Sequence, residues 1–181
     1  MSDTIVLDAC CLINLAAASA LDTWLGDLGH TWMLPEAVLN EAIFLRGSSA
    51  DGGDPDGPEP TELTPHIASG LLTVVQPETE QELTAYVDFA RDLDDGEAMA
   101  LAIAQCRGWQ LATDDRKAMR LARKAAVPVL TTPTVVKLWV DALRPSAAEI
   151  RATLVAIRDR ARFLPGGRDP LCDWWMERMQ R

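Results

Sequence analysis

The sequence is poor in the residues that hold zinc, form disulfides or cross membranes. It contains only two histidines, and no two of its four cysteines have the Cys-x-x-Cys spacing of a zinc site. No apolar run approaches the roughly 18 residues that span a bilayer, and no basic stretch stands before the first apolar segment, as a signal peptide would require. These absences predict a protein that spans no membrane, resides in the reducing cytoplasm and keeps its cysteines as buried thiols.

Basic residues are nearly absent from the first 106 positions, which carry 2 of the 17 Lys and Arg residues but 19 of the 27 Asp and Glu residues. Residues 107–181 hold the other 15 basic and 8 acidic residues, so the net charge of −10 divides into −17 and +7. This division suits a polyanionic substrate held on a basic surface beside an acidic cluster. It also suits solvated helix faces that pair with the acidic half, and charge counting alone favours that second interpretation.

The segment from Leu93 to Arg116, LDDGEAMALAIAQCRGWQLATDDR, gives the clearest local prediction. Aspartates are good N-caps, so a helix should begin near Asp95, and Gly108 should end it. The residues WQLAT that follow have the pattern of a short buried strand. A crossover helix followed by a buried strand is typical of a βαβ unit with parallel strands.

Three acidic residues of this segment are candidate site residues. Asp114 and Asp115 come directly after the strand, and ligand sites of such folds lie at the carboxyl ends of parallel strands. Glu97, in the first turn of the helix, joins them if that helix end faces the same edge. The alternative is that Glu97 is only a favourable charge at a helix start and Asp115 only an N-cap.

Strand and helix patterns alternate along the whole chain. Strands are expected at 4–7, 30–34, 71–75, 109–113 and 127–130, with helices at 9–21, from Pro35 onward, and at 77–92, 116–126, 134–143 and 146–163. The alternation predicts an α/β fold with a parallel sheet and helices on both faces. We expect one domain over residues 1–181, with a core at about 4–135 and a helical C-terminal extension at 136–181, in which Trp174 and Trp175 cover the core.

Acidic residues from distant parts of the chain can meet at one edge of this sheet. Asp8 ends the first strand, Glu41 lies on the helix after Pro35, and Glu97 with Asp114 or Asp115 would complete the cluster. Hard divalent ions such as Mg²⁺ or Mn²⁺ prefer such oxygen ligands. Two such ions about 4 Å apart would activate a water and stabilise the leaving oxygen in phosphodiester hydrolysis. Close carboxylates repel one another, so some should be partly protonated without metal.

Four segments resemble, in order, the four acidic motifs of the PIN domain family: TIVLDACCLINLA, LPEAVLNEAI, LDDGEAMALAIA and LATDDRKA. The D-x-G-E version resembles a subfamily of prokaryotic PIN proteins related to VapC toxins, and the similarity covers roughly residues 4–135. The resemblance implies a three-layer α/β/α fold with a five-stranded parallel sheet. It also implies a metal-dependent ribonuclease, often neutralised by an antitoxin, and a homodimer.

The resemblance assigns expected roles to the acidic residues. Asp8 is the metal ligand after the first strand, and Glu41, six residues after Pro35, is the second acid. Glu97 stands where many relatives carry Asp, and Asp115 fits the T-x-D position, with Asp114 beside it.

Two residues of the first helix stand near Asp8. Cys10 occupies a position where relatives usually have Ser, Thr or Asn, so a supporting hydrogen bond is expected to be weaker. Asn14 is either a supporting donor or only a tolerated polar residue near a helix start.

These observations favour an Mg²⁺- or Mn²⁺-dependent endoribonuclease that acts on RNA. The expected catalytic residues are Asp8, Glu41, Glu97 and Asp115, and the expected metal ligands are Asp8, Glu97, Asp114 and Asp115. Phosphate contacts are expected from Arg116, Lys117 and Arg120. The alternative is a non-catalytic PIN-like module that binds nucleic acid or a protein. A HAD-type phosphatase fits less well, because Asp8 is not followed by a second Asp two residues later.

Overall fold

A parallel sheet lies at the centre of the structure, a computed structural model that describes residues 3–18, 21–40 and 63–180. Within these residues the sheet has five strands in the order β3-β2-β1-β4-β5, and all neighbouring pairs are parallel. The strands are β1 (Thr4–Leu7), β2 (Thr31–Pro35), β3 (Leu72–Val75), β4 (Gln110–Ala112) and β5 (Val129–Leu130). The sequence prediction of a five-stranded parallel sheet is confirmed.

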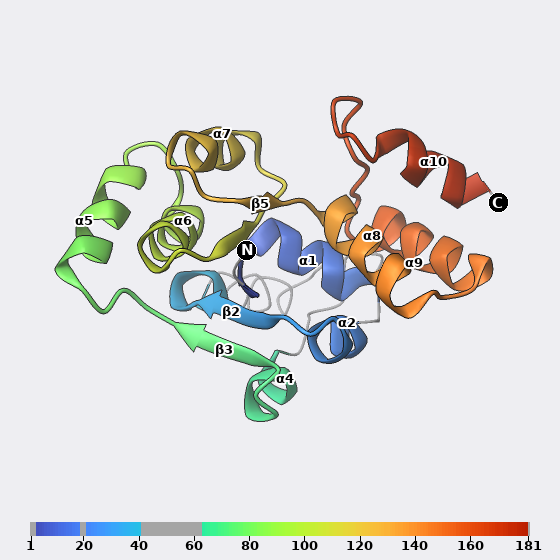
Figure 1. The fold of residues 1–181 in the computed structure, drawn as a ribbon, viewed down its shortest axis with the longest axis horizontal. Helices are drawn as coiled ribbons and strands as arrows, with labels where there is room; N and C mark the ends of the chain where they lie inside the picture. Colours follow the sequence, from blue (N-terminus) through green and yellow to red (C-terminus); the bar gives the residue numbers. More distant parts are fainter. Residues whose placement is uncertain (1–2, 19–20, 41–62, 181) are drawn as a thin grey trace, which may run out of the picture.

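Helices cover both faces of the sheet, which gives the predicted three-layer α/β/α fold (Figure 1). One face carries α5 (Glu80–Phe89), α6 (Asp95–Arg107) and α7 (Arg116–Lys124). The other face carries α1 (Ala9–Ala17), α2 (Leu21–Asp27), α4 (Thr64–Ala68), α8 (Thr132–Leu143), α9 (Ala147–Arg160) and α10 (Cys172–Gln180). Crossover helices of this kind connect parallel strands because a tight turn cannot.

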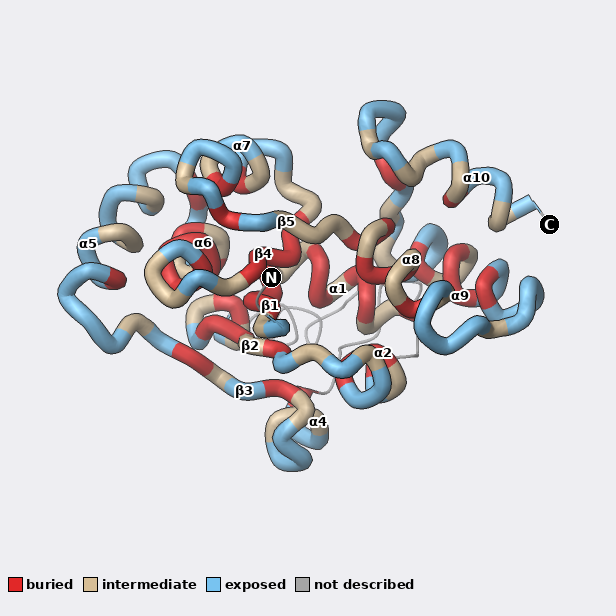
Figure 2. The backbone as a smooth tube through the Cα atoms, viewed as in Figure 1, coloured by how far each residue is buried: buried red, intermediate tan, exposed pale blue. Residues whose placement is uncertain are grey.

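The central strand β1 divides the apolar core into two parts. Ile5 and Leu7 belong to the core under α1, α8 and α9, whereas Val6 belongs to the core under α6 and α7. This alternation follows from the two-residue period of a strand, and all three side chains are fully buried. Figure 2 shows the buried residues gathered at the sheet and the exposed residues on the outer sides of the helices. β1 is therefore held from both faces, and so is the residue at its end.

Helix α6 begins and ends where the sequence predicts. The Asp94 side chain accepts a hydrogen bond from the Glu97 backbone N–H at 2.9 Å, so it is the N-cap. Gly108 follows the last turn with φ +66, a conformation that glycine adopts at little cost. Because α6 lies between the sheet, α5 and α7, it is apolar around most of its circumference and buries seven residues.

Several predicted boundaries are wrong. Pro35 does not open a helix: it pairs with Val75 as the last residue of β2, and the residues after it, 36–40, are helical. The helix predicted at 77–92 begins only at Glu80, because a capping box at Thr79 starts it there. The helix predicted at 146–163 ends at Arg160, and Arg162 has a left-handed backbone with φ 53.

The C-terminal tryptophans lie as expected at the core: Trp175 is fully buried and Trp174 packs against the same core cluster. The Gly-, Pro- and Asp-rich residues 47–62, whose composition predicts a surface loop, lie outside the described residues. Among the described residues no single helix is long and apolar enough to cross a membrane; only α1 and α2 taken together, as a bent pair, reach that length and hydropathy.

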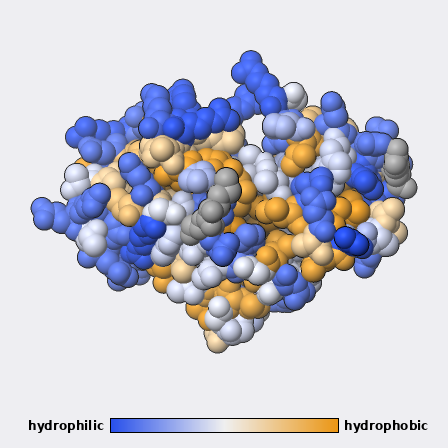
Figure 3. Space-filling view, viewed as in Figure 1, coloured by the Kyte–Doolittle hydropathy of each residue, from blue (hydrophilic) through white to orange (hydrophobic). Residues whose placement is uncertain are grey.

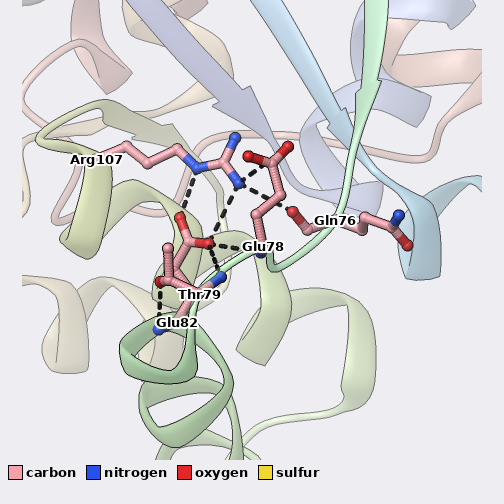
Figure 4. Close-up of polar contacts among 5 residues, drawn as sticks. All are labelled: Gln76, Glu78, Thr79, Glu82 and Arg107. Atoms are coloured by element: carbon pink, nitrogen blue, oxygen red, sulfur yellow. Dashed lines mark hydrogen bonds and ion pairs between the residues drawn. The ribbon is translucent and has the colours of Figure 1, made fainter.

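A buried ion pair fixes α5 to the end of α6 (Figure 4). The Arg107 Nε donates to Glu82 Oε1 at 2.5 Å, and the Glu82 side chain is only 3% exposed. Arg107 also donates to the Gln76 carbonyl, and Glu82 accepts the backbone N–H groups of Glu78 and Thr79. The hydrogen bond from Arg107, together with these N–H groups, lowers the pKa of Glu82 to about 2 despite its burial.

We expect Glu82→Gln to lower the free energy of unfolding by about 2 kcal/mol at pH 7, because it leaves the partly buried Arg107 guanidinium without its charged partner. A carboxyl with a lowered folded-state pKa stabilises above the unfolded value of 4.5 and loses that effect as the pH falls toward 2. Urea unfolding across this range should therefore show the wild type and the variant converging. Glu80→Gln, at an exposed position of the same helix, is the control; a difference that stays constant with pH would contradict the prediction.

Candidate active site

The candidate site lies at the carboxyl ends of the two neighbouring strands β1 and β4. Their register pairs Leu7 with Ala112, and the Asp8 backbone N–H continues the ladder by donating to the Ala112 carbonyl at 3.0 Å. Asp8 and the residues Thr113 to Asp115 therefore leave the sheet side by side. The structure brings these acidic residues together at one sheet edge, although a hundred positions separate them in the sequence.

Asp8 is held in one position by three donors. The Ala9 N–H donates to Oδ1 at 2.6 Å, while the Thr113 hydroxyl and the Cys10 thiol donate to Oδ2 at 2.6 and 3.0 Å. The Asp8 side chain is 2% exposed, and this burial raises its pKa although the three hydrogen bonds oppose the shift. Burial also raises the pKa of the Cys10 thiol, which keeps it protonated and able to donate. The supporting hydrogen bond that was expected to be weaker at this position is present, with the Cys10 thiol as its donor.

Thr113, which was not among the predicted site residues, connects the two strand ends. Its side chain is fully buried, and besides donating to Asp8 its hydroxyl accepts the Asp115 N–H at 3.1 Å. The sequence does indicate Thr113, because it is the first residue of the T-x-D motif, but functional roles were assigned only to the two aspartates beside it.

The pKa of Glu97 indicates that this residue lies among other negative charges. Desolvation raises its pKa to about 7, and the negative charges of Asp94, Asp115 and Asp8 add to the shift in that order. No described Lys or Arg forms an ion pair with Glu97 or Asp8. The raised pKa of Glu97 agrees with the expectation that close carboxylates are partly protonated without metal, and Asp94, expected only as an N-cap, contributes most among the neighbouring charges.

Asp115 and Asp114 have different surroundings. One oxygen of Asp115 accepts the backbone N–H groups of Lys117 and Ala118, both at 2.7 Å, so Asp115 is the N-cap of α7. Its other oxygen has no hydrogen bond within the described residues. Asp114 accepts donors on both oxygens: the Thr132 N–H at 2.9 Å on one, and the Asn14 amide at 3.0 Å with the Thr132 hydroxyl on the other.

This arrangement makes Asp114 a connection between α1 and the start of α8. Asn14 is the supporting donor that the sequence suggested, although it supports Asp114 and not Asp8. Glu41, the expected second acid, lies outside the described residues. The role of Asp114 as a metal ligand and that of Glu41 as a catalytic acid stay predictions.

The three expected phosphate contacts, Arg116, Lys117 and Arg120, are exposed on α7, whose surface in Figure 3 is strongly hydrophilic. Lys117 pairs with Asp92 at 3.3 Å, which is the internal pairing that charge counting favoured. The Arg116 guanidinium extends to the turn before α10, where a Cβ built on Gly166 would lie 3.3 Å from its Nη2. Arg116 thus reaches the C-terminal segment.

A cavity of about 430 Å³ opens beside the carboxylates. Its lining comes from three parts of the chain: Cys10, Ile13 and Asn14 of α1; Glu97, Asp114 and Asp115 of the acidic cluster; and Ala161, Arg162 and Phe163 after α9. The third part was missed, because the sequence pattern placed these residues inside a helix.

The donor set fits a hard divalent cation in its chemistry. The groups are carboxylates, and desolvation together with the neighbouring negative charges raises the pKa of Glu97. Among the residues that the structure describes, however, no three His, Cys, Asp or Glu side chains are arranged closely enough to enclose a metal ion. The described residues therefore supply the charge for a metal site without a complete, preformed ligand cage.

A family model described as PIN domain matches residues 4–165, most of the chain. A comparison with curated proteins gives no match.

The raised pKa of Glu97 predicts a pH-dependent effect of Glu97→Gln on metal-free protein. Below the ordinary value of 4.5 the carboxyl is neutral in both folded and unfolded states, so the substitution should change little. Above about 7 the folded state holds a charge that its neighbours repel, so Gln should stabilise by on the order of 1 kcal/mol, reduced by solvent screening. Thermal unfolding in EDTA at both ends of this range measures the difference. Glu36→Gln, at an exposed residue, is the control, and an equal effect at both pH values would refute the prediction.

Proposed function

Since the chain belongs to the PIN domain family, whose members are typically nucleases that use divalent metal ions, we propose that it is an Mg²⁺- or Mn²⁺-dependent endoribonuclease. The observation that carries the proposal is the uncompensated carboxylate cluster around Glu97, which lines a cavity at the ends of β1 and β4. Like charges that are partly removed from water are unfavourable for folding, so their retention at a cavity supports a functional role.

Asp8, Glu97 and the free oxygen of Asp115 would hold the ion. A bound Mg²⁺ or Mn²⁺ supplies Lewis-acid polarisation of the scissile phosphate and lowers the pKa of the attacking water. The hydrogen bonds from Ala9, Cys10 and Thr113 keep the Asp8 carboxylate in one orientation.

The reaction would be hydrolysis of a phosphodiester bond in RNA. A water oxygen forms a bond to phosphorus, the bond from phosphorus to the leaving sugar oxygen breaks, one proton leaves the water and one is gained by the leaving oxygen. Glu41, by its place in the motif order, would orient the attacking water. Asp114 would position the cluster through Thr132 and Asn14.

Electrostatics favours a nucleic acid on the side of α7. Arg116 and Arg120 lie exposed on the helix that begins directly after Asp115, and residues 107–181 carry an excess of positive charge. Phosphates attracted to this surface would reach the carboxylates at the helix N-terminus. The resemblance to VapC-type sequences supports a further proposal, that the protein is a homodimeric toxin controlled by an antitoxin.

One observation favours a second candidate function. The described residues do not form a group of three metal-binding side chains, which is what a non-catalytic PIN-like module would show. Such a module would use the basic surface of α7 to bind nucleic acid or a protein without cleaving it.

Asp8→Asn should reduce RNA cleavage by on the order of 100-fold or more, because it removes a charge needed to hold the ion while a neutral side chain suits the buried position. Cleavage of a labelled RNA with Mn²⁺, compared by gel, measures the loss, and circular dichroism checks the fold. Asp95→Asn, an exposed acid of the same helix turn as Glu97, is the matched control. Full activity in the Asp8 variant would end the nuclease proposal.

Calorimetric titration with Mn²⁺ separates the two candidate functions. A metal-dependent nuclease should bind Mn²⁺ in the wild type, and both Asp8→Asn and Glu97→Gln should weaken this binding by about tenfold or more. The non-catalytic module predicts no Mn²⁺ binding that depends on either residue. Asp95→Asn again serves as the control.

A further inference from the structure

The chain that follows α9 supplies part of the cavity beside the carboxylates. Ala161, Arg162 and Phe163 line it together with Ile13 of α1, whereas the acids come from α6 and the loop after β4. The residues that line this cavity thus include acidic residues, the cationic Arg162 and partly buried apolar residues. None of the acidic motifs includes the C-terminal residues.

Arg162 carries its side chain at a position where the backbone favours glycine. Its φ of 53 is left-handed and ends α9, and glycine is the usual residue at such a helix end. Arg162 is exposed, and among the residues that the structure describes its guanidinium has neither a hydrogen bond nor an ion pair. A cation at the edge of an acidic cavity is thus available to an anionic ligand.

Phe163 presents a held aromatic ring to the same cavity. Its ring contacts Trp175 of α10 edge-on, with centroids 6.0 Å apart and planes at 77°. Trp175 is fully buried, so it fixes the position of Phe163, which is itself only partly buried. A fixed, partly open phenyl ring is a surface on which a base can stack.

We propose that Arg162 and Phe163 form a subsite for one unpaired nucleotide next to the scissile phosphate. The proposal rests on the proposed function, because it takes RNA as the substrate. Phe163 stacks on the base and Arg162 binds the phosphate of that nucleotide, while Ile13 and Ala161 enclose the base with apolar contacts. A cavity of about 430 Å³ is of a size for a single small ligand unit. A duplex cannot occupy it, because its bases are already stacked and paired.

This subsite differs in character from the exposed helix α7. Arg116 and Arg120 would attract any phosphate backbone regardless of sequence or strandedness. Arg162 acts within the cavity that also contains Glu97 and Asp115, so it aligns the RNA with the carboxylates. The site consequently selects single-stranded RNA over duplex RNA.

The experiment uses Arg162→Gly and the matched control Arg144→Gly. Both residues are exposed arginines with left-handed backbone at helix ends, φ 53 and φ 50, and both substitutions remove one charge and relieve the same strain. Only Arg162 lines the cavity. In the full-length protein with Mn²⁺, Arg162→Gly should weaken binding of a short single-stranded RNA, measured by fluorescence anisotropy, by about fivefold or more, and Arg144→Gly should not. Equal effects of the two substitutions would overturn the subsite.

Phe163→Leu tests stacking while it keeps apolar bulk against Trp175. It should weaken binding of the normal oligonucleotide by about fivefold or more and leave binding of an abasic oligonucleotide of the same length unchanged. Equal weakening for both oligonucleotides would show a structural role and overturn the stacking assignment.

Tight binding without any cleavage by the wild type would refute the nuclease proposal and spare the subsite. Cleavage and binding that are unaffected by both substitutions would refute the subsite and spare the nuclease.

Discussion

The candidate site depends on the register of one pair of strands. Because β1 and β4 are parallel and Leu7 lies opposite Ala112, Asp8 and Thr113 leave the sheet at the same level, and a 2.6 Å hydrogen bond joins them. A shift of one residue in this register would turn the side chains to opposite faces of the sheet. The burial of Ile5, Val6 and Leu7 on both faces of β1 opposes any such shift. The two apolar cores therefore fix the positions of Asp8 and Thr113 at the ends of β1 and β4.

The carboxylates at the ends of β1 and β4 are electrostatically unfavourable, in contrast to the buried Glu82 elsewhere in the fold. Glu82 is buried as deeply as Asp8, yet Arg107 and two backbone N–H groups lower its pKa. Asp8 has only neutral donors, and Glu97 has acidic neighbours, so burial raises both of their pKa values. The fold thus contains one buried carboxylate with a lowered pKa, Glu82, and another with a raised pKa, Asp8. The contrast distinguishes the ends of β1 and β4 as a place where carboxylates have no basic partner among the residues that the structure describes.

Much of this arrangement could be predicted from the sequence because its signals are local. The β-favouring run TIVL before Asp8 marks β1, and Asp94 and Gly108 delimit α6. The convergence of Asp8 with Asp114 and Asp115 then follows from the rule that parallel strands end at one edge. The distinction between Asp114 and Asp115 could not be predicted. It depends on Thr132 and Asn14, which come from elements distant in the sequence.

The end of α9 was beyond prediction for a different reason. Nothing in the residues DRARFLP marks a left-handed Arg162, because glycine and asparagine, the usual signals, are absent from that run. Tertiary packing decides the boundary instead: Phe163 lies against Trp175, and α10 packs along α9.

The C-terminal extension consequently does more than finish the fold. The family match ends at residue 165, before α10, but it includes Arg162 and Phe163, whose placement depends on a tryptophan ten positions past that limit. Trp175 is fully buried and reaches the core that also contains Ile5 and Leu7 of β1. The strand that positions Asp8 and the helix that positions Phe163 therefore share one apolar core. A change in the packing of this core would therefore move the carboxylates relative to the C-terminal wall of the cavity. The burial that fixes the strand register thus also determines the shape of the cavity.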